Sequence, residues 1–118
     1  MPYSFRGRHL LVDFFGVDPV KLRNCRGLMR VMRAALKKAG FQIIGAAGSH
    51  QFKTGGQGVT GFILLSESHA AFHSYPEAGY IALDVYSCGK CDPRPVAAAL
   101  EAYLVPQKVT RALKKRGL

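Results

Sequence analysis

Long hydrophobic runs are absent from this sequence of 118 residues. Charged residues or glycine interrupt every apolar stretch well before eighteen residues, which excludes a helix that crosses a membrane. The segment from Met1 to Arg8 has no apolar core of the length that a signal peptide requires. We therefore expect a cytoplasmic protein that forms one domain, residues 1–118.

Acidic residues are also scarce, with 7 Asp and Glu against 17 Lys and Arg and a formal net charge of +10. Such a balance admits nucleic acid, an anionic membrane surface or anionic small molecules as partners. Many of the basic residues fall on one predicted helix and on the C-terminal segment (Lys21, Arg23, Arg26, Arg30, Arg33, Lys37, Lys38; Lys108, Arg111, Lys114, Lys115, Arg116). No basic run alternates with aromatic residues, so we interpret both groups as solvated faces and do not expect a nucleic-acid partner.

Cysteine occurs only three times, and an odd number without a secretory signal argues against a disulfide framework. Cys25 falls on the apolar side of a predicted helix, where a small core residue fits. Cys88 and Cys91 form a C-x-x-C pair that is considered separately below.

Hydrophobic residues make up 48% of the chain, which is enough for a packed core. Apolar patterning predicts strands over 8–15, 41–47, 59–66 and 80–87, with a further edge strand over 108–113. Steps of three and four predict a helix over 19–39, with Asp18 as its N-cap, and another over 93–104. Two helices and five or six strands predict an α+β fold, a two-layer sandwich with the helices on one face of a mainly antiparallel sheet.

The opening pattern of the chain returns in its second half. Leu11-Val12-Asp13-Phe14 precedes Asp18-Pro19, and Ala82-Leu83-Asp84-Val85 precedes Asp92-Pro93. In both places a strand that carries an aspartate leads into an Asp-Pro helix start, as an internal duplication would leave.

An ordered set of reactive residues lies between Gly58 and Cys88. It contains Ser66-Glu67-Ser68-His69, with His73 five residues and Cys88 twenty residues after Ser68. This set resembles the bacterial and archaeal S-adenosylmethionine decarboxylase proenzymes, and the resemblance extends from Gly7-Arg8-His9 to Asp92-Pro93.

The resemblance implies that the chain makes its own prosthetic group. Ser68 would attack the carbonyl of Glu67, the chain would break into 1–67 and 68–118, and Ser68 would become a pyruvoyl group. Only a residue with a β-hydroxyl or thiol can begin this shift, and its hydroxyl needs activation. The resemblance assigns proton transfer to His73, and Thr60 stands where the family usually has a processing serine.

The implied reaction is decarboxylation of S-adenosylmethionine, which supplies aminopropyl groups for spermidine. The pyruvoyl carbonyl would form a Schiff base with the substrate amine and accept electrons as carbon dioxide leaves, so no exogenous cofactor or metal is expected. Cys88 would then protonate the α-carbon, and Glu67 marks the cleavage site rather than a catalyst.

Aromatic faces suit a sulfonium cation and an adenine ring, and Phe52 and Tyr75 are the candidates for substrate binding. The loop 53–57 is about two residues longer than is usual in the family and lacks the common proline, and the net positive charge repels a cationic substrate. Pyruvoyl-dependent decarboxylation of arginine or ornithine on the same scaffold is therefore the alternative.

Other interpretations stay open at this point. The chain could be a basic nucleic-acid-binding module that is never cleaved, or a proenzyme that no longer matures because of Thr60. The C-x-x-C pair could be a thioredoxin-like redox pair, could bind zinc together with His69 and His73, or could form a disulfide that switches the enzyme off.

The family resemblance also implies symmetric assemblies with active sites between protomers. Because 118 residues make a small core for a two-chain product, we expect at least a dimer of the cleaved protomer. Whether a polyamine activates the enzyme, and how large the assembly is, do not follow from the sequence.

Overall fold

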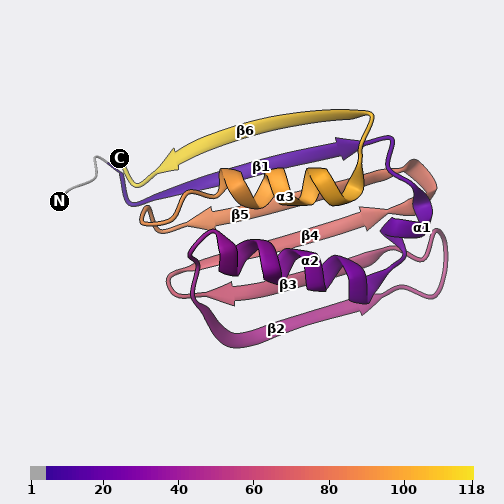
Figure 1. The fold of residues 1–118 in the computed structure, drawn as a ribbon, viewed down its shortest axis with the longest axis horizontal. Helices are drawn as coiled ribbons and strands as arrows, with labels where there is room; N and C mark the ends of the chain where they lie inside the picture. Colours follow the sequence, from indigo (N-terminus) through magenta and orange to yellow (C-terminus); the bar gives the residue numbers. More distant parts are fainter. Residues whose placement is uncertain (1–4) are drawn as a thin grey trace.

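The computed structural model describes residues 5–118 as one antiparallel sheet with helices packed against it (Figure 1). In chain order the elements are β1 (Gly7–Phe15), α1 (Pro19–Leu22), α2 (Cys25–Lys38), β2 (Ile43–Gln51), β3 (Val59–Leu65), β4 (Ser68–Tyr75), a short 3₁₀ helix η1 (Pro76–Ala78), β5 (Tyr80–Ser87), α3 (Arg94–Leu104) and β6 (Lys108–Arg116). The strands lie in the order β2-β3-β4-β5-β1-β6, and every neighbouring pair is antiparallel.

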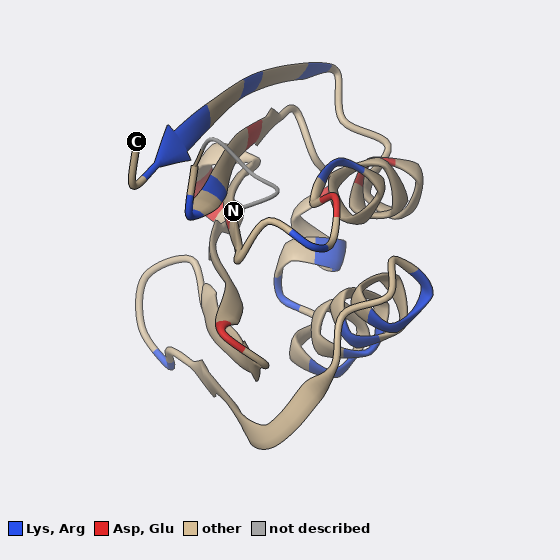
Figure 2. Cartoon of the chain, turned by 90° about the vertical axis from the view of Figure 1, so that its left-hand side faces the viewer, with Lys and Arg blue, Asp and Glu red and all other residues tan. Residues whose placement is uncertain are grey.

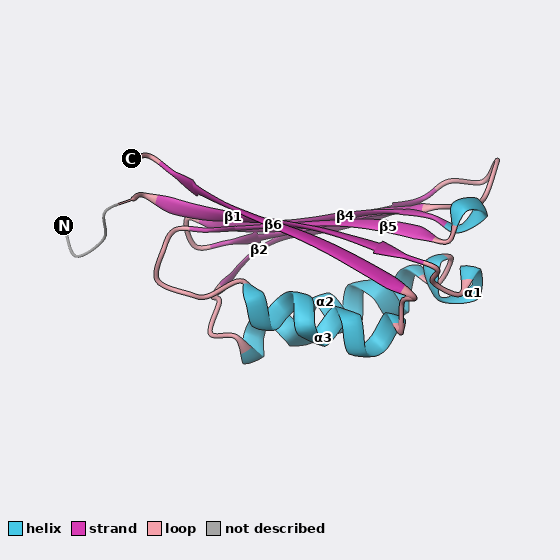
Figure 3. Cartoon of the chain, turned by 90° about the horizontal axis from the view of Figure 1, so that it is seen from above, coloured by secondary structure: helices cyan, strands magenta, loops and turns pink. Residues whose placement is uncertain are grey.

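The helices α1, α2 and α3 lie on the same side of the sheet, as Figure 3 shows. Side chains alternate along the strands, so that Ile81, Leu83 and Val85 of β5 are buried between the layers. They belong to the same core as Leu28 and Leu36 on the apolar side of α2, which are fully buried. The predicted α+β two-layer sandwich is confirmed, and so are the strand over 80–87 and the edge position of the last strand.

The first helical segment differs from the prediction of one helix over 19–39. It is divided into α1 and α2 because the chain turns at Arg23 and Asn24. The Asn24 side chain accepts a hydrogen bond of 3.0 Å from the N–H of Gly27 and so begins a second helix, while Asp18 caps α1 as predicted. The apolar spacing continues across the break, which is why periodicity alone did not reveal it.

The structure contains one strand that was not predicted, and two predicted strands have different bounds. β4 was not predicted, because its inward residues include the small or polar Ser68, Ala70 and Ser74, which do not form an apolar pattern. Ser74 is tolerated in the core because its hydroxyl donates to the carbonyl of Leu22 and accepts from the N–H of Val59. β2 begins two residues later than predicted and ends at Gln51, and β6 continues to Arg116.

The face of the sheet that the helices leave uncovered is called the open face below. Its exposed apolar side chains are Leu11, Phe15, Phe62, Leu64 and Tyr75. The basic residues gather along β6, at the edge of the sheet, and on the outer side of α2 (Figure 2). Within residues 5–118, no helix is long and apolar enough to span a membrane.

The two halves of the chain with the repeated strand-helix order lie side by side in the structure. β1 leads into α1 and α2, β5 leads into α3, and the two strands are neighbours in the sheet. The duplication itself stays a prediction.

Candidate active site

The Glu67–Ser68 bond lies in the hairpin between β3 and β4. Leu65 pairs with Ser68, which leaves Ser66 and Glu67 as the two loop residues. Glu67 has a φ of 57°, in the left-handed region that side chains other than glycine rarely adopt. This conformation costs about 1–2 kcal/mol. Backbone strain is therefore stored in the residue whose carbonyl precedes Ser68.

Ser68 is held from the neighbouring strand. It is the first residue of β4, it is buried, and its Oγ accepts a hydrogen bond of 3.0 Å from the N–H of Cys88. The pairing of β4 with β5 brings these two residues together although twenty positions separate them in sequence. Among residues 5–118, no imidazole or carboxylate hydrogen bonds to this hydroxyl. We call Glu67, Ser68 and Cys88 the cleavage cluster.

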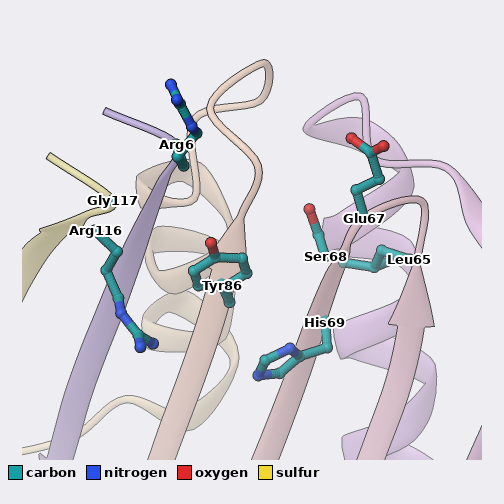
Figure 4. A pocket seen from close by; sticks show the side chains of 8 residues that line it. All are labelled: Arg6, Leu65, Glu67, Ser68, His69, Tyr86, Arg116 and Gly117. Atoms are coloured by element: carbon teal, nitrogen blue, oxygen red, sulfur yellow. The ribbon is translucent and has the colours of Figure 1, made fainter. Parts of the chain in front are cut away.

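Two cavities flank the cleavage cluster. The larger, of about 610 Å³, is shown in Figure 4, with Glu67 and Ser68 on one side and Arg6, Tyr86 and Arg116 on the other. The smaller, of about 240 Å³, extends toward the helix layer and contains Cys88. Its lining residues are Gly40, Phe41, Gln42, Ser66, Glu67, Ser68, Cys88, Lys90 and Cys91. The bond predicted to break therefore has space for a small molecule on both sides.

Aromatic rings from three strands pack beside the larger cavity. The ring of His69 stacks on that of Tyr86 at 5.7 Å between centroids, and His9 meets both rings edge-on. The guanidinium carbon of Arg116 lies 5.7 Å from the centre of the Tyr86 ring. His9 Nε2 is buried and has no hydrogen-bond partner within the described part of the chain.

Sequence reasoning missed most of this group, and named His69 only as a candidate zinc ligand. The strand period of two could have found it, because His9 pairs with Tyr86 and Tyr86 with His69 across the open face. Arg6 and Arg116 carried no signal, because they meet only when β6 returns beside β1.

Both residues of the C-x-x-C pair, Cys88 and Cys91, line the smaller cavity. Both thiols are free and half-buried. The Cys91 thiol donates to the carbonyl of Gly40 at 3.3 Å, and the Cys91 carbonyl accepts from Ser87 and Arg8. Cys25 is partly buried against the core, near its predicted place.

The remaining predicted site residues gather around a different cavity, of about 430 Å³. His73 and Thr60 face each other across β4 and β3, with 3.0 Å between Nδ1 of His73 and Oγ1 of Thr60. Phe52 and Tyr75 line the same cavity and are half exposed. We call Phe52, Thr60, His73 and Tyr75 the histidine cluster.

The two clusters do not meet within one chain. Ser68 and His73 are five residues apart on the same strand, which corresponds to about 16 Å. An odd separation also places their side chains on opposite faces, and Ser68 is buried while His73 is exposed. The structure thus joins Ser68 with Cys88, and His73 with Thr60, but not Ser68 with His73.

The strand geometry also bears on the zinc alternative. His69 and His73 lie four residues apart on β4, about 13 Å, which is too far for both to bind one tetrahedral ion with Cys88 and Cys91. Within residues 5–118, no three His, Cys, Asp or Glu side chains are grouped to hold a metal.

One titratable group on the open face is strongly perturbed. The hydroxyl of Tyr80 donates a hydrogen bond of 2.5 Å to Asp13, and this bond raises the pKa of Tyr80 to about 12. The Tyr80 ring also stacks between those of Tyr75 and Phe15, at 5.5 and 5.2 Å. Tyr75 of the histidine cluster is therefore oriented by neighbours that stay uncharged at ordinary pH.

Comparison with known proteins agrees with the resemblance seen in the sequence. The family model described as S-adenosylmethionine decarboxylase matches residues 8–117. A protein of Symbiobacterium thermophilum named S-adenosylmethionine decarboxylase proenzyme is 40% identical over 118 residues, which cover 99% of this chain and 87% of that protein. One of the same name from Methanococcus maripaludis is 34% identical over 113 residues, covering 95% and 90%. The crystal structure of the adenosylmethionine decarboxylase from Aquifex aeolicus superimposes with a TM-score of 0.83 at 30% identity, covering 98% of this chain and 94% of that one.

Proposed function

This chain belongs to the S-adenosylmethionine decarboxylase family, and from that premise we propose that it is a carboxy-lyase that removes carbon dioxide from S-adenosylmethionine after cutting itself between Glu67 and Ser68. The names of the relatives favour this substrate over arginine or ornithine. Spermidine synthesis and a cytoplasmic location are part of the proposal.

The conformation of the β3–β4 hairpin supports self-cleavage at the Glu67–Ser68 bond. Ser68 Oγ attacks the carbonyl carbon of Glu67, the Glu67–Ser68 amide becomes an ester, and the Ser68 nitrogen takes up a proton as a free amine. Loss of the Ser68 α-proton then expels the Glu67 carboxylate and leaves dehydroalanine. Water replaces the nitrogen, which departs as ammonia, and a ketone remains. The left-handed φ of Glu67 supports this proposal, because opening the chain there releases its strain.

The residues around Ser68 suit a pyruvoyl group at that position. When formed, the group supplies an electrophilic carbonyl that withdraws electrons from the substrate's α-carbon. The new end of β4 would lie between the two cavities, with the Cys88 N–H directed at its first residue. Cys88 lines the smaller cavity, and we assign its thiol to deliver a proton to the α-carbon after carbon dioxide leaves.

The histidine cluster enters the site from a second copy. The open face carries apolar side chains that no helix covers, as expected of a surface that packs against another sheet. Two sheets stacked face to face, with strands in opposite directions, place the Ser68 end of one copy over the His73 end of the other. In such a pair the partner's His73 serves the proton transfers at Ser68, with Thr60 as its hydrogen-bond partner.

Mass spectrometry of the denatured wild-type protein tests the cut. The two pieces are expected to sum to the mass of the chain plus one water less one ammonia, whereas simple hydrolysis adds a whole water. Ser68→Ala should stay full-length, and Cys88→Ala should be cleaved and yet release carbon dioxide slowly. If these two variants behave alike, the assigned roles are wrong.

A parallel assay tests the substrate. Wild-type protein is given S-adenosylmethionine, arginine and ornithine in separate reactions, and carbon dioxide is measured. Release from S-adenosylmethionine alone supports the proposal, and release only from an amino acid overturns it.

A further inference from the structure

Two arginines line the larger cavity opposite the cleavage cluster. Arg6 directly precedes β1, and Arg116 is the last residue of β6 (Figure 4). The backbone fixes both, because the N–H of Arg6 donates to the carbonyl of Arg116 at 2.8 Å. Gly117 has a φ of 74°, and a Cβ there would lie 2.4 Å from Cγ of Arg6. The C-terminal turn is thus packed tightly against Arg6.

The side chain of Arg116 lies beside the aromatic rings that line the larger cavity. Its guanidinium lies over the ring of Tyr86, that ring stacks on His69, and His69 follows Ser68 directly. Stacking on a ring holds the planar guanidinium while leaving its edge N–H groups free to donate. A ligand that fills the larger cavity, which Ser68 also lines, can therefore contact an oriented fork of donors.

The charges of the proposed substrate determine which of its groups can bind beside the two arginines of the larger cavity. S-adenosylmethionine carries a sulfonium and an ammonium, both positive, and one carboxylate. Guanidinium groups repel the first two and bind the third, often through two parallel hydrogen bonds.

We propose that Arg116 binds the carboxylate of the substrate and so orients it beside residue 68, with Arg6 adding positive charge to the same cavity. This inference rests on the proposed function. The contact is made with the bound substrate and weakens as carbon dioxide leaves, so it strengthens substrate binding and does not accelerate the chemical step. Once the carboxylate is lost, the product has two positive charges beside two arginines, which favours its release.

The test compares Arg116→Met with Arg30→Met and with wild-type protein. Arg30 is exposed on α2, on the other side of the sheet, so its loss removes the same charge far from the cavity. For each protein, self-cleavage is followed by mass, KM and kcat are measured with S-adenosylmethionine, and the inhibition constant is measured for decarboxylated S-adenosylmethionine.

Arg116→Met is expected to mature normally and to raise KM roughly 10- to 100-fold, with kcat unchanged or higher. The inhibition constant of the product, which lacks the carboxylate, should not rise. Arg30→Met should match wild type, and Arg116→Lys should recover part of the lost affinity. An unchanged KM overturns the inference. So does an equal loss of affinity for substrate and product, or a failure to mature, because either would tie Arg116 to the hairpin instead. Wild-type protein without activity would refute the proposed function itself.

Discussion

Two inactive chains should restore each other's activity if each active site draws residues from two copies. The first chain carries Ser68→Ala, so it cannot form the reactive end but retains His73. The second carries His73→Ala and retains Ser68. Each chain alone assembles only with itself and lacks one of the two clusters at every site.

The expected recovery follows from the geometry. Ser68 and His73 of one chain are about 16 Å apart and on opposite faces of β4, so they cannot act on one bond. A hybrid dimer of the two variants holds one complete site and one site that lacks both groups. With equal expression, half of the dimers are hybrids, and the mixture should reach about one quarter of wild-type activity.

The assay co-expresses the two chains with different affinity tags and measures carbon dioxide release and cleavage in the mixture. It then isolates the hybrids by two successive purifications, and these should reach about one half of wild-type activity. The control hybrid joins a wild-type chain to a chain that carries both substitutions. If each site combines Ser68 of one copy with His73 of the other, the control hybrid has no complete site. If each site is formed within one chain, the control hybrid has one complete site. Activity in the control hybrid and none in the first would therefore refute the shared site.

Three further outcomes are expected. Thr60→Val removes the hydroxyl that hydrogen bonds to His73 and should slow self-cleavage about 10²-fold with the fold intact, while Thr60→Ser stays close to wild type in a time course by mass. Tyr80→Phe should lower the free energy of unfolding by about 1 kcal/mol at pH 8. Because the pKa of Tyr80 is about 12 in the folded protein and 10.0 in the unfolded chain, this difference should persist below pH 10 and shrink between pH 10 and 12. Urea titrations across that range check it, and equal stability of Tyr80→Phe and wild type at pH 8 would contradict it. Finally, hydrogen peroxide should inactivate the wild-type protein reversibly by oxidising the thiols of Cys88 and Cys91 to a disulfide, and Cys91→Ser should resist this inactivation. Equal activity of oxidised wild type, reduced wild type and Cys91→Ser would discard this switch.

The layers of the fold were predictable because they rest on hydrophobic periodicity. The helix spacing and the alternation of β5 each describe one buried face, and only one architecture buries both. The break at Asn24 was not predictable in this way, since a capping hydrogen bond to Gly27 is a local polar interaction that leaves the apolar spacing unchanged.

Half of the candidate site was predictable for a different reason. A reactive set such as Ser68 and Cys88 is identified by the order and spacing of its residues, and the pairing of β4 with β5 then brings the two together. The arginines beside them could not be found, because nothing local to residue 116 indicates that β6 ends next to the start of β1.

His73 is the most informative case. It lies five residues from Ser68, and closeness in sequence invites the assumption that the two act together in one chain. Once β4 is known to be a strand, the odd offset requires opposite faces and the rise along the strand requires a wide gap. In the proposed dimer, the same short motif supplies the cleavage cluster of one site and the histidine cluster of another. In a uniform assembly every copy carries the same substitution, so single variants cannot show which copy supplies Ser68 and which supplies His73, whereas mixed assemblies can.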